Sequence, residues 1–264
     1  IDTVRNDPQL KLVPTQASTF WLEFPGHEKP ESPFNKKQVR EAVSLAIDRQ
    51  ALSDAESAGY SQPANNWIPN DWPGAIKGPD PKYDPARAKQ LLAEAGYPDG
   101  FDVEQLTPLP PYNSLAERVI GQLREVGIRT KLNVMERAAF ATKLTEGREA
   151  IPGMILNISG LPGDAASRIR TFATCNGPST RICYPDDIDK KMQAYDASVN
   201  PQERERLITE MQQFINDNHL FVPVYRLAFF IAVGPRVLNE PTEVIANIPQ
   251  YIYLGPYEDF MVKD

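Results

Sequence analysis

Residues 32–49 read SPFNKKQVREAVSLAIDR, the most informative stretch of the chain. Its apolar residues are separated by intervals of three, one, three and one, and they are Val39, Ala42, Val43, Ala46 and Ile47. This spacing places them in one stripe along a helix, with the charged side chains largely on the other side. The pattern therefore predicts an amphipathic helix from Lys37 to Leu52.

The composition of the whole chain is that of a globular protein. Of its 264 residues, 41% are hydrophobic and 24% are charged, which is too apolar for intrinsic disorder. The most apolar segment, residues 221–233, is interrupted by Pro223 and Arg226, so we expect no membrane span, which needs roughly 20 apolar residues. The net charge of −7 argues against a nucleic-acid partner, because nucleic acids require a basic surface.

Several classes of function lack their usual sequence signals. The two histidines, His27 and His219, lie far apart and away from the cysteines, so we expect no metal site and no cofactor. The glycine-rich nucleotide motifs and the G-x-S-x-G motif of hydrolases do not occur. The chain begins at Ile1 without an initiator methionine or an apolar signal segment, so we expect a processed or truncated product.

Outside the first helix, strands and helices alternate. After a short polar lead, we expect strands at 19–24, 101–106, 128–134, 153–158, 221–225 and 229–233. Further helices are expected at 85–95, 114–126, 138–144, 165–172, 187–197 and 201–218. The order strand, helix, strand within residues 101–134 favours a parallel pair. The fold class is therefore α/β, with α+β as the borderline alternative.

Three local patterns refine these elements. Asp84 and Asn200 are expected to cap the helices that follow them, and Ser114 with Glu117 has the spacing of a capping box. Residues 59–85 form a long proline-rich loop, and loops of this length are usually functional.

The two cysteines, Cys175 and Cys183, flank one short irregular loop that contains Gly177 and Pro178. They could form a disulfide, or remain free thiols in the core of a cytosolic protein. We favour the disulfide, which would stabilise the fold by about 2–3 kcal/mol on the chain-entropy account. A disulfide would in turn indicate an oxidising compartment.

Polar side chains follow two of the predicted strands. Arg168 and Arg170 come after Asp164, beyond the carboxyl end of a strand, where α/β proteins bind ligands and a guanidinium can pair with a carboxylate. The alternative is a surface helix with solvated arginines. Tyr112 and Asn113 occupy a similar junction, where a helix N-terminus can bind an anion. Plain helix capping is the alternative there.

Three blocks of sequence carry a resemblance to a known family. Residues 32–49 resemble the pattern PF-x-(D/N)-x-x-VR-x-A-(I/V)-x-x-AID-R, residues 83–97 (YDPARAKQLLAEAGY) resemble YDP-x-x-A-x-x-LL-x-x-AGY, and residues 122–128 (QLREVGI) resemble QL-x-x-(I/V)GI. Together they are similar to the peptide/nickel class of extracytoplasmic solute-binding proteins, the dipeptide- and oligopeptide-binding family of ABC importers. The resemblance extends over essentially the whole chain.

This resemblance implies a periplasmic binding protein-like lobe with a mixed sheet flanked by helices. Family members have two lobes that close on a ligand, and this sequence is similar to the carboxyl-terminal half. Residues 1–16 would be a piece of the first lobe and hinge, 17–233 the second ligand-binding lobe, and 234–264 a return segment of the first lobe. Apolar residues of that segment would pack on the missing N-terminal half, namely Tyr251, Ile252, Tyr253 and Phe260.

The sequence departs from the peptide-binding members where they hold the peptide. Those proteins often have a Trp, an Asp for the peptide ammonium and then Asp-Pro, whereas residues 157–165 read NISGLPGDA and keep only Asp164. A buried ammonium without a counter-charge costs several kcal/mol, so a simple dipeptide is disfavoured. The arginine that dipeptide binders use for the peptide carboxylate would fall near residues 113–115, where this sequence has none. Arg137 and Arg168 point instead to an anionic or polar solute. The expected ligand-binding residues are Tyr112, Asn113, Arg137, Asn157, Ser159, Asp164 and Arg168.

The resemblance implies a binding protein and not an enzyme. The chain would be half of the periplasmic substrate-binding component of an ABC importer, which captures a peptide-like or other small polar solute and delivers it to the membrane permease. One alternative is a secreted hydrolase, which requires a nucleophile with a base within hydrogen-bonding reach. Another is a ligand sensor that docks on a receptor.

Overall fold

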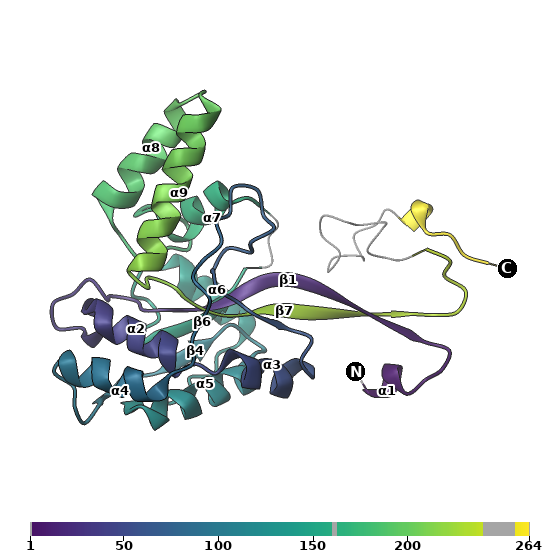
Figure 1. The fold of residues 1–264 in the computed structure, drawn as a ribbon, viewed down its shortest axis with the longest axis horizontal. Helices are drawn as coiled ribbons and strands as arrows, with labels where there is room; N and C mark the ends of the chain where they lie inside the picture. Colours follow the sequence, from purple (N-terminus) through teal and green to yellow (C-terminus); the bar gives the residue numbers. More distant parts are fainter. Residues whose placement is uncertain (1, 160–162, 240–256, 264) are drawn as a thin grey trace.

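A five-stranded mixed sheet forms the centre of the computed structural model, which describes residues 2–159, 163–239 and 257–263 (Figure 1). The strand order is β2-β7-β1-β6-β4. The strands are β1 (Lys11–Glu23), β2 (Gln62–Pro63), β4 (Leu106–Pro108), β6 (Met154–Ile158) and β7 (Val222–Val233). β4 and β6 run parallel, and the other neighbours run antiparallel. With helices on both faces, this is the predicted mixed sheet flanked by helices.

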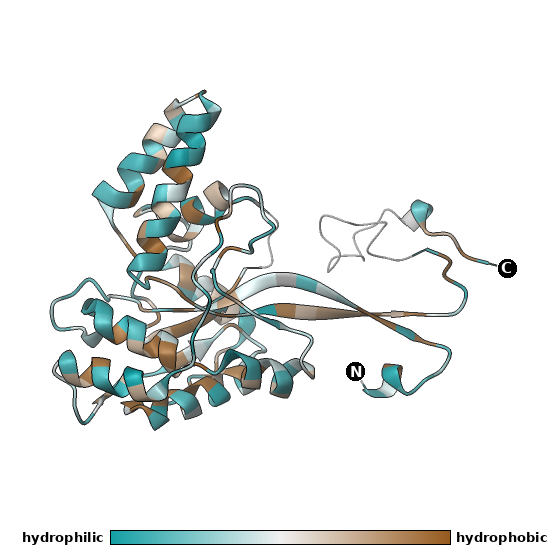
Figure 2. Cartoon of the chain, viewed as in Figure 1, coloured by the Kyte–Doolittle hydropathy of each residue, from teal (hydrophilic) through white to brown (hydrophobic). Residues whose placement is uncertain are grey.

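The first face of the sheet carries the larger apolar core. It is covered by helices α2 (Lys37–Ala46), α3 (Arg49–Ser57), α4 (Pro85–Glu94) and α5 (Asn113–Glu125). Phe20 and Leu22 of β1 pack there against the predicted stripe of α2. Hydrophobic and hydrophilic residues alternate along these helices, as the brown and teal segments of Figure 2 show. The amphipathic pattern of residues 37–46 is thereby confirmed.

The single helix predicted from Lys37 to Leu52 is, however, two helices. Ile47 has an extended backbone, and the Asp48 carboxylate accepts a hydrogen bond from the N–H of Ala51 at 2.9 Å. This is an N-cap, so a new helix starts at Arg49. The apolar spacing continues across the break, which is why the spacing alone did not reveal it.

The second face of the sheet carries a smaller core. It is covered by α7 (Ala165–Phe172), the π-helical turn η2 (Pro185–Asp189), α8 (Lys190–Ala197) and α9 (Pro201–Asp217). Trp21 of β1 lies on this face, and Trp67 stacks on Phe221 at 4.3 Å between ring centroids. In Figure 1, α8 and the start of α9 project from the body as a helical hairpin.

Residues 101–134 contain the predicted parallel pair in shortened form. β3 (Phe101–Asp102) and β5 (Ile128–Arg129) pair in parallel, with α5 between them in sequence. The predicted capping box is wrong, because α5 begins at Asn113 and the Ser114 hydroxyl donates to Glu56 Oε1 at 2.7 Å. The short helix α6 (Arg137–Thr145) follows β5.

β1 and β7 extend beyond the sheet as a two-stranded ribbon, in which Lys11 lies opposite Val233. The two strands predicted within residues 221–233 are one continuous strand. The segment before residue 19, expected to be a polar lead, contains the first part of β1 from Lys11 onward. Figure 1 shows α1 (Asp2–Arg5) and η4 (Tyr257–Asp259) at the far end of this ribbon. The predictions for Gly160 to Pro162 and for Tyr251 to Tyr253 fall outside the described residues.

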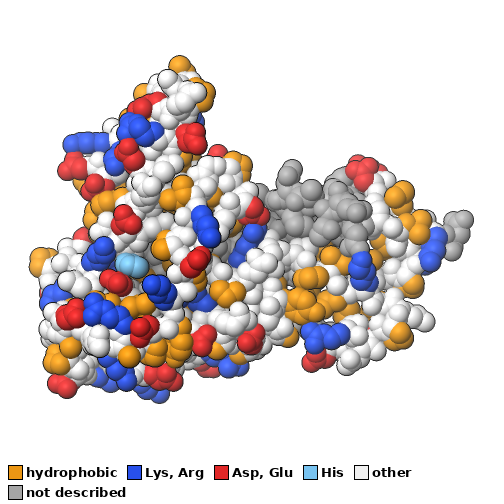
Figure 3. All heavy atoms as spheres, in the orientation of Figure 1, with side chains coloured by type: hydrophobic (Ala, Val, Ile, Leu, Met, Phe, Trp, Pro, Cys, Tyr) orange, Lys and Arg blue, Asp and Glu red, His pale blue; other side chains and the backbone are white. Residues whose placement is uncertain are grey.

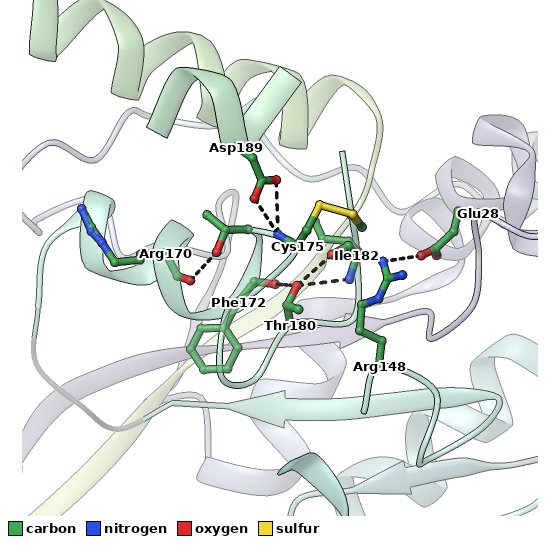
Figure 4. Close-up of a disulfide and its surroundings, with 10 residues drawn as sticks. Glu28, Arg148, Arg170, Phe172, Cys175, Thr180, Ile182 and Asp189 are labelled. Atoms are coloured by element: carbon green, nitrogen blue, oxygen red, sulfur yellow. Dashed lines mark hydrogen bonds and ion pairs between the residues drawn. A yellow bond between two sulfur atoms is a disulfide. The ribbon is translucent and has the colours of Figure 1, made fainter. Parts of the chain in front are cut away.

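The predicted disulfide is present between Cys175 and Cys183 (Figure 4). The N–H of Cys175 donates to the Asp189 carboxylate at 3.0 Å, and the Thr180 hydroxyl lies 3.0 Å from the carbonyl oxygen of Phe172. These contacts fasten the disulfide loop to α7 and η2.

None of the helices in the described part of the chain is both long and apolar enough to cross a membrane.

Candidate ligand-binding site

The candidate site lies at one edge of the central sheet. Because β4 and β6 are parallel, their carboxyl ends meet at the same edge, and α5 and α7 begin just beyond them. Ile158, the last residue of β6, lies opposite Phe20, and beyond this pair β1 is flanked by β7 alone. The strand ends therefore open where the ribbon leaves the sheet, a typical place for a ligand in α/β proteins.

Three of the predicted site residues follow β4 and β5. The ring of Tyr112 packs edge-on against Phe20 at 4.7 Å between centroids. The exposed Arg137, at the start of α6, donates from Nη1 to the carbonyl oxygen of Pro110 at 2.8 Å. The side-chain Oδ1 of Asn113 is buried and has no hydrogen-bond partner within the described residues. These side chains form the β4 side of the edge.

Asn157 serves a buried carboxyl group and does not face solvent. Its side chain is 3% exposed and donates to Glu23 Oε1 at 2.8 Å, and Trp21 Nε1 donates to the same oxygen at 2.7 Å. Burial raises the pKa of Glu23 above its ordinary value. Sequence reasoning missed Glu23, because a charged residue at the end of a strand is usually solvated.

Ser159 and Asp164 lie beyond the end of β6. The exposed Asp164 caps α7, since its Oδ1 accepts from the N–H of Ser167 at 2.7 Å while Ser167 Oγ accepts from the N–H of Asp164 at 3.1 Å. This reciprocal pair is a capping box. Helix capping thus occupies one oxygen of the Asp164 carboxylate.

Arg168 lies inside the protein. It is 3% exposed, and its Nη2 donates to Ser18 Oγ at 2.7 Å and to the carbonyl oxygen of Ser159 at 3.4 Å. Its guanidinium carbon lies 4.7 Å from the ring centre of Trp72 and 5.1 Å from that of Trp21. Burial lowers the pKa of Arg168 to about 9. Arg170, in contrast, is exposed on the surface and forms an ion pair with Asp196 at 2.5 Å.

The long proline-rich loop adds polar groups near the base of the ribbon. The loop carries Trp72, and another part of it lines a cavity of about 180 Å³ at the base of the ribbon. Thr19 and Arg226 form its strand side, and Arg226 pairs with Asp71 of the loop at 2.9 Å. The loop side is rich in amides, with Asn65, Asn66 and Asn70. The cavity is therefore polar and adjoins the strand-end edge.

A larger cavity of about 280 Å³ lies elsewhere, beside β7 and across β1 from β6. Glu41 and Ser44 of α2, Lys82, Asn216 and His219 are among its lining residues. Burial and the charges of Lys37, Arg40 and Arg49 lower the pKa of His219 to about 4. This cavity lies away from the carboxyl ends of β4 and β6. We therefore place the candidate site at the strand ends and not in this cavity.

The chemistry that a hydrolase needs is not assembled around His27. Its ring nitrogens contact the carbonyl oxygen of Phe24 at 3.1 Å and the Tyr184 hydroxyl at 2.8 Å, so the ring is held by structural partners. Burial lowers its pKa to about 4. Over residues 2–159, 163–239 and 257–263, no three His, Cys, Asp or Glu side chains are grouped to hold a metal ion.

The surface in Figure 3 shows acidic and basic side chains interspersed over the described part of the face in view. A nucleic-acid surface would instead show a basic stripe. The arrangement at the strand ends, with hydroxyls, amides and arginines around tryptophan rings, fits binding of a small polar molecule.

Comparisons with known proteins agree with this geometry. The family model described as "Bacterial extracellular solute-binding proteins, family 5 Middle" matches residues 1–180. The chain is similar to the glutathione-binding protein GsiB of Salmonella paratyphi A, at 32% identity over 74% of this chain and 40% of that protein. It is also similar to heme-binding protein A of Haemophilus influenzae, at 26% identity over 89% of this chain and 44% of that protein.

Among solved structures, NikA from Brucella suis matches with a TM-score of 0.83 and 20% identity. The match covers 99% of this chain and 54% of NikA. The chain thus spans less than half of the length of the curated relatives it matches, and about half of that solved structure.

Proposed function

Because this chain belongs to the bacterial extracellular solute-binding proteins of family 5, we propose that it forms one wall of the ligand cleft in the substrate-binding protein of an ABC importer. The family consists of binding proteins and not of enzymes, so the task of the chain is recognition. The bound solute is a peptide-like or other small polar molecule, which the protein hands to the membrane permease.

One observation carries this proposal: the β1–β7 ribbon leaves the sheet at the strand ends where the polar residues gather. Two strands that cross together from one body to another can act as a hinge. Residues 17–233 then form one lobe, and residues 1–16 and 234–264 are pieces of the other. The register of β1 and β7 shifts between Gln16 and Thr19, close to this boundary.

Closure of the two lobes is the mechanism. A solute held at the strand ends bridges both lobes, and its higher affinity for the closed state shifts the population toward that state. The permease can then distinguish loaded from empty protein. No covalent chemistry is involved.

The proposal includes a periplasmic location. The Cys175–Cys183 disulfide persists in an oxidising compartment, which the periplasm provides. The two relatives are named for different ligands, glutathione and heme. The identity of the solute therefore has to be inferred from the residues of the site itself.

A thermal-shift screen of the full-length protein tests the proposal. The panel contains glutathione, trialanine, heme, nickel chelates, opines and sugars. A solute present at 100 times its Kd stabilises the folded protein by about 2.7 kcal/mol, which raises the melting temperature measurably. The 264-residue chain should respond less than the full-length protein, because it supplies one wall of the cleft. If no member of the panel shifts the melting temperature, importer function is contradicted.

A further inference from the structure

Arginines buried in this protein differ in how fully their N–H groups are used. Four arginine side chains among the described residues are at most 4% exposed, namely Arg40, Arg49, Arg168 and Arg181. Arg40 donates to three backbone carbonyl oxygens, and Arg49 to three carbonyl oxygens and the Ser44 hydroxyl. Arg181 donates to three carbonyl oxygens and is attracted by Glu23.

Arg168 uses its donors least in this set, although Arg181 also has one buried nitrogen, Nε, without a partner among the described residues. Both hydrogen bonds of Arg168 come from Nη2, and the one to Ser159 is long at 3.4 Å. Its Nη1 is buried and has no partner among the described residues. No acidic side chain offsets the effect of burial on its pKa. An unused buried donor costs about 1–3 kcal/mol, and a bound group that accepts a hydrogen bond from Nη1 would remove this cost.

Three aromatic rings surround the guanidinium of Arg168, and they differ in exposure. Trp21 is fully buried and Phe172 is 8% exposed, whereas Trp72 is half-buried. Trp72 also approaches most closely, with its ring centre 4.7 Å from the guanidinium carbon. It belongs to the loop between β2 and α4 and not to the sheet. Trp72 is therefore the ring on the solvent side of the guanidinium, packed at the edge of the second core.

We propose that Arg168 receives a carboxylate group of the bound solute, and that the Trp72 ring covers the guanidinium until the solute displaces it. This inference rests on the proposed function and adds the chemical class of the ligand. Nη1 donates to a carboxylate oxygen through a charge-assisted hydrogen bond, while Nη2 stays on Ser18. Asp164, the acidic residue nearest in sequence, is held in the cap of α7 and leaves Arg168 available.

Acetate is the simplest probe of this site, and tryptophan fluorescence reports on it. The chain has three tryptophans, of which Trp21 and Trp72 contact Arg168. Titration of the 264-residue chain with acetate, with total ionic strength held constant by NaCl, should give a saturable fluorescence change with a Kd on the order of millimolar. Acetamide should give none.

Two variants assign the response. Arg168→Met should abolish it, while Arg170→Met, on the same helix, should keep it because Arg170 is exposed and paired with Asp196. Near-UV circular dichroism checks that both variants are folded. Should Arg168→Met fail to fold, Trp72→Ala replaces it, and this variant should bind acetate more tightly because the covering ring is gone. Weaker or unchanged acetate binding in Trp72→Ala contradicts the covering role.

The proposal is overturned if acetate gives no saturable change, or if Arg168→Met responds like the unmodified chain. Two further comparisons on the full-length protein separate the sources of the carboxylate: trialanine against its C-terminal amide, and succinate against succinamide. A tenfold preference for the acid in either pair supports the inference, and no preference in both contradicts it. Since acetate needs no importer substrate, its result is independent of the thermal-shift screen, so the two proposals can fail separately.

Discussion

The two faces of the central sheet differ in how their buried charged groups are paired. Under α2, α4 and α5 the core is apolar, and the arginines beside it, Arg40 and Arg49, each donate to three backbone carbonyl oxygens. Under α7 and α9, Arg168 Nη1 and Glu23 Oε2 are buried without a partner in the described part of the chain. We infer that the first face is built for stability and that the second is partly reserved for a ligand.

Of the substitutions that test this contrast, replacement of Arg49 is expected to change the free energy of unfolding most. Arg49→Met removes the guanidinium donors from the carbonyl oxygens of Ser44, Ile47 and Pro223, and each buried group that is left unpaired costs about 1–3 kcal/mol. We expect the free energy of unfolding, measured by urea denaturation, to fall by about 3–5 kcal/mol.

Arg87→Met is the matched control for this variant. Arg87 lies on the surface, where it pairs with Glu94, and surface ion pairs contribute about 0–1 kcal/mol. If Arg49→Met and Arg87→Met lower the free energy of unfolding equally, the hydrogen bonds of Arg49 do not stabilise the fold. The contrast between the two faces then fails.

A pH titration tests the second face through His27. Its ring is 1% exposed, and burial lowers its pKa to about 4 in spite of Glu28 Oε2 at 3.4 Å from Nδ1. The unfolded chain binds a proton near pH 6.5 and the folded chain only near pH 4, so stability falls as the pH drops between these values. At about 1.4 kcal/mol per pKa unit, the loss reaches roughly 3 kcal/mol.

The variant His27→Gln isolates this contribution, because glutamine does not titrate. Urea denaturation at pH 7, 5.5 and 4.5 should show that the unmodified chain loses stability relative to His27→Gln as the pH falls. Parallel curves for the two proteins would show that His27 is not held neutral by burial.

The disulfide provides the next smaller effect on the same face. Replacing Cys175 and Cys183 by serine opens a short loop and should lower the free energy of unfolding by about 2–3 kcal/mol. The reduced unmodified chain serves as the control and should match the double variant. A reduced chain as stable as the oxidised one would mean that the loop is held by other contacts, such as that of Asp189 with the N–H of Cys175.

The smallest effect is expected for the residue at the centre of the contrast. Arg168→Met removes a buried charge with one short hydrogen bond, and the gain from removing the charge offsets the loss of the Ser18 contact and of the cation–π contacts. Its free energy of unfolding should stay within about 1 kcal/mol of that of the unmodified chain. A loss comparable with that of Arg49→Met would make Arg168 a structural residue.

The sequence predicted the elements whose apolar pattern faces a single core. The stripe of α2, the caps at Asp84 and Asn200, and helix α7 all appear as expected, because each depends on neighbours in sequence. The break at Asp48 and the full length of β1 were missed. β1 extends to Lys11 because β7 pairs with it from the other end of the chain, and such a partner leaves no local signal.

The candidate site was predicted by position more than by role. The rule that ligands bind beyond strand ends placed Tyr112, Asn113, Ser159 and Asp164 along one edge of the sheet. Spacing could not show that Arg168 and Asn157 are buried, since this depends on Ser18, Glu23 and Trp72, which are distant in sequence. Long-range contacts of this kind are fixed by packing and not by local pattern.

Hydrogen–deuterium exchange of the full-length protein, with and without the solute that most raises its melting temperature, tests the central claim most directly. If this chain binds solute at the strand ends, residues 109–116 and 163–172 become protected, and exchange in the α8–α9 hairpin is unchanged. Protection confined to the cavity beside β7, at residues 79–82 and 216–223, would contradict the account.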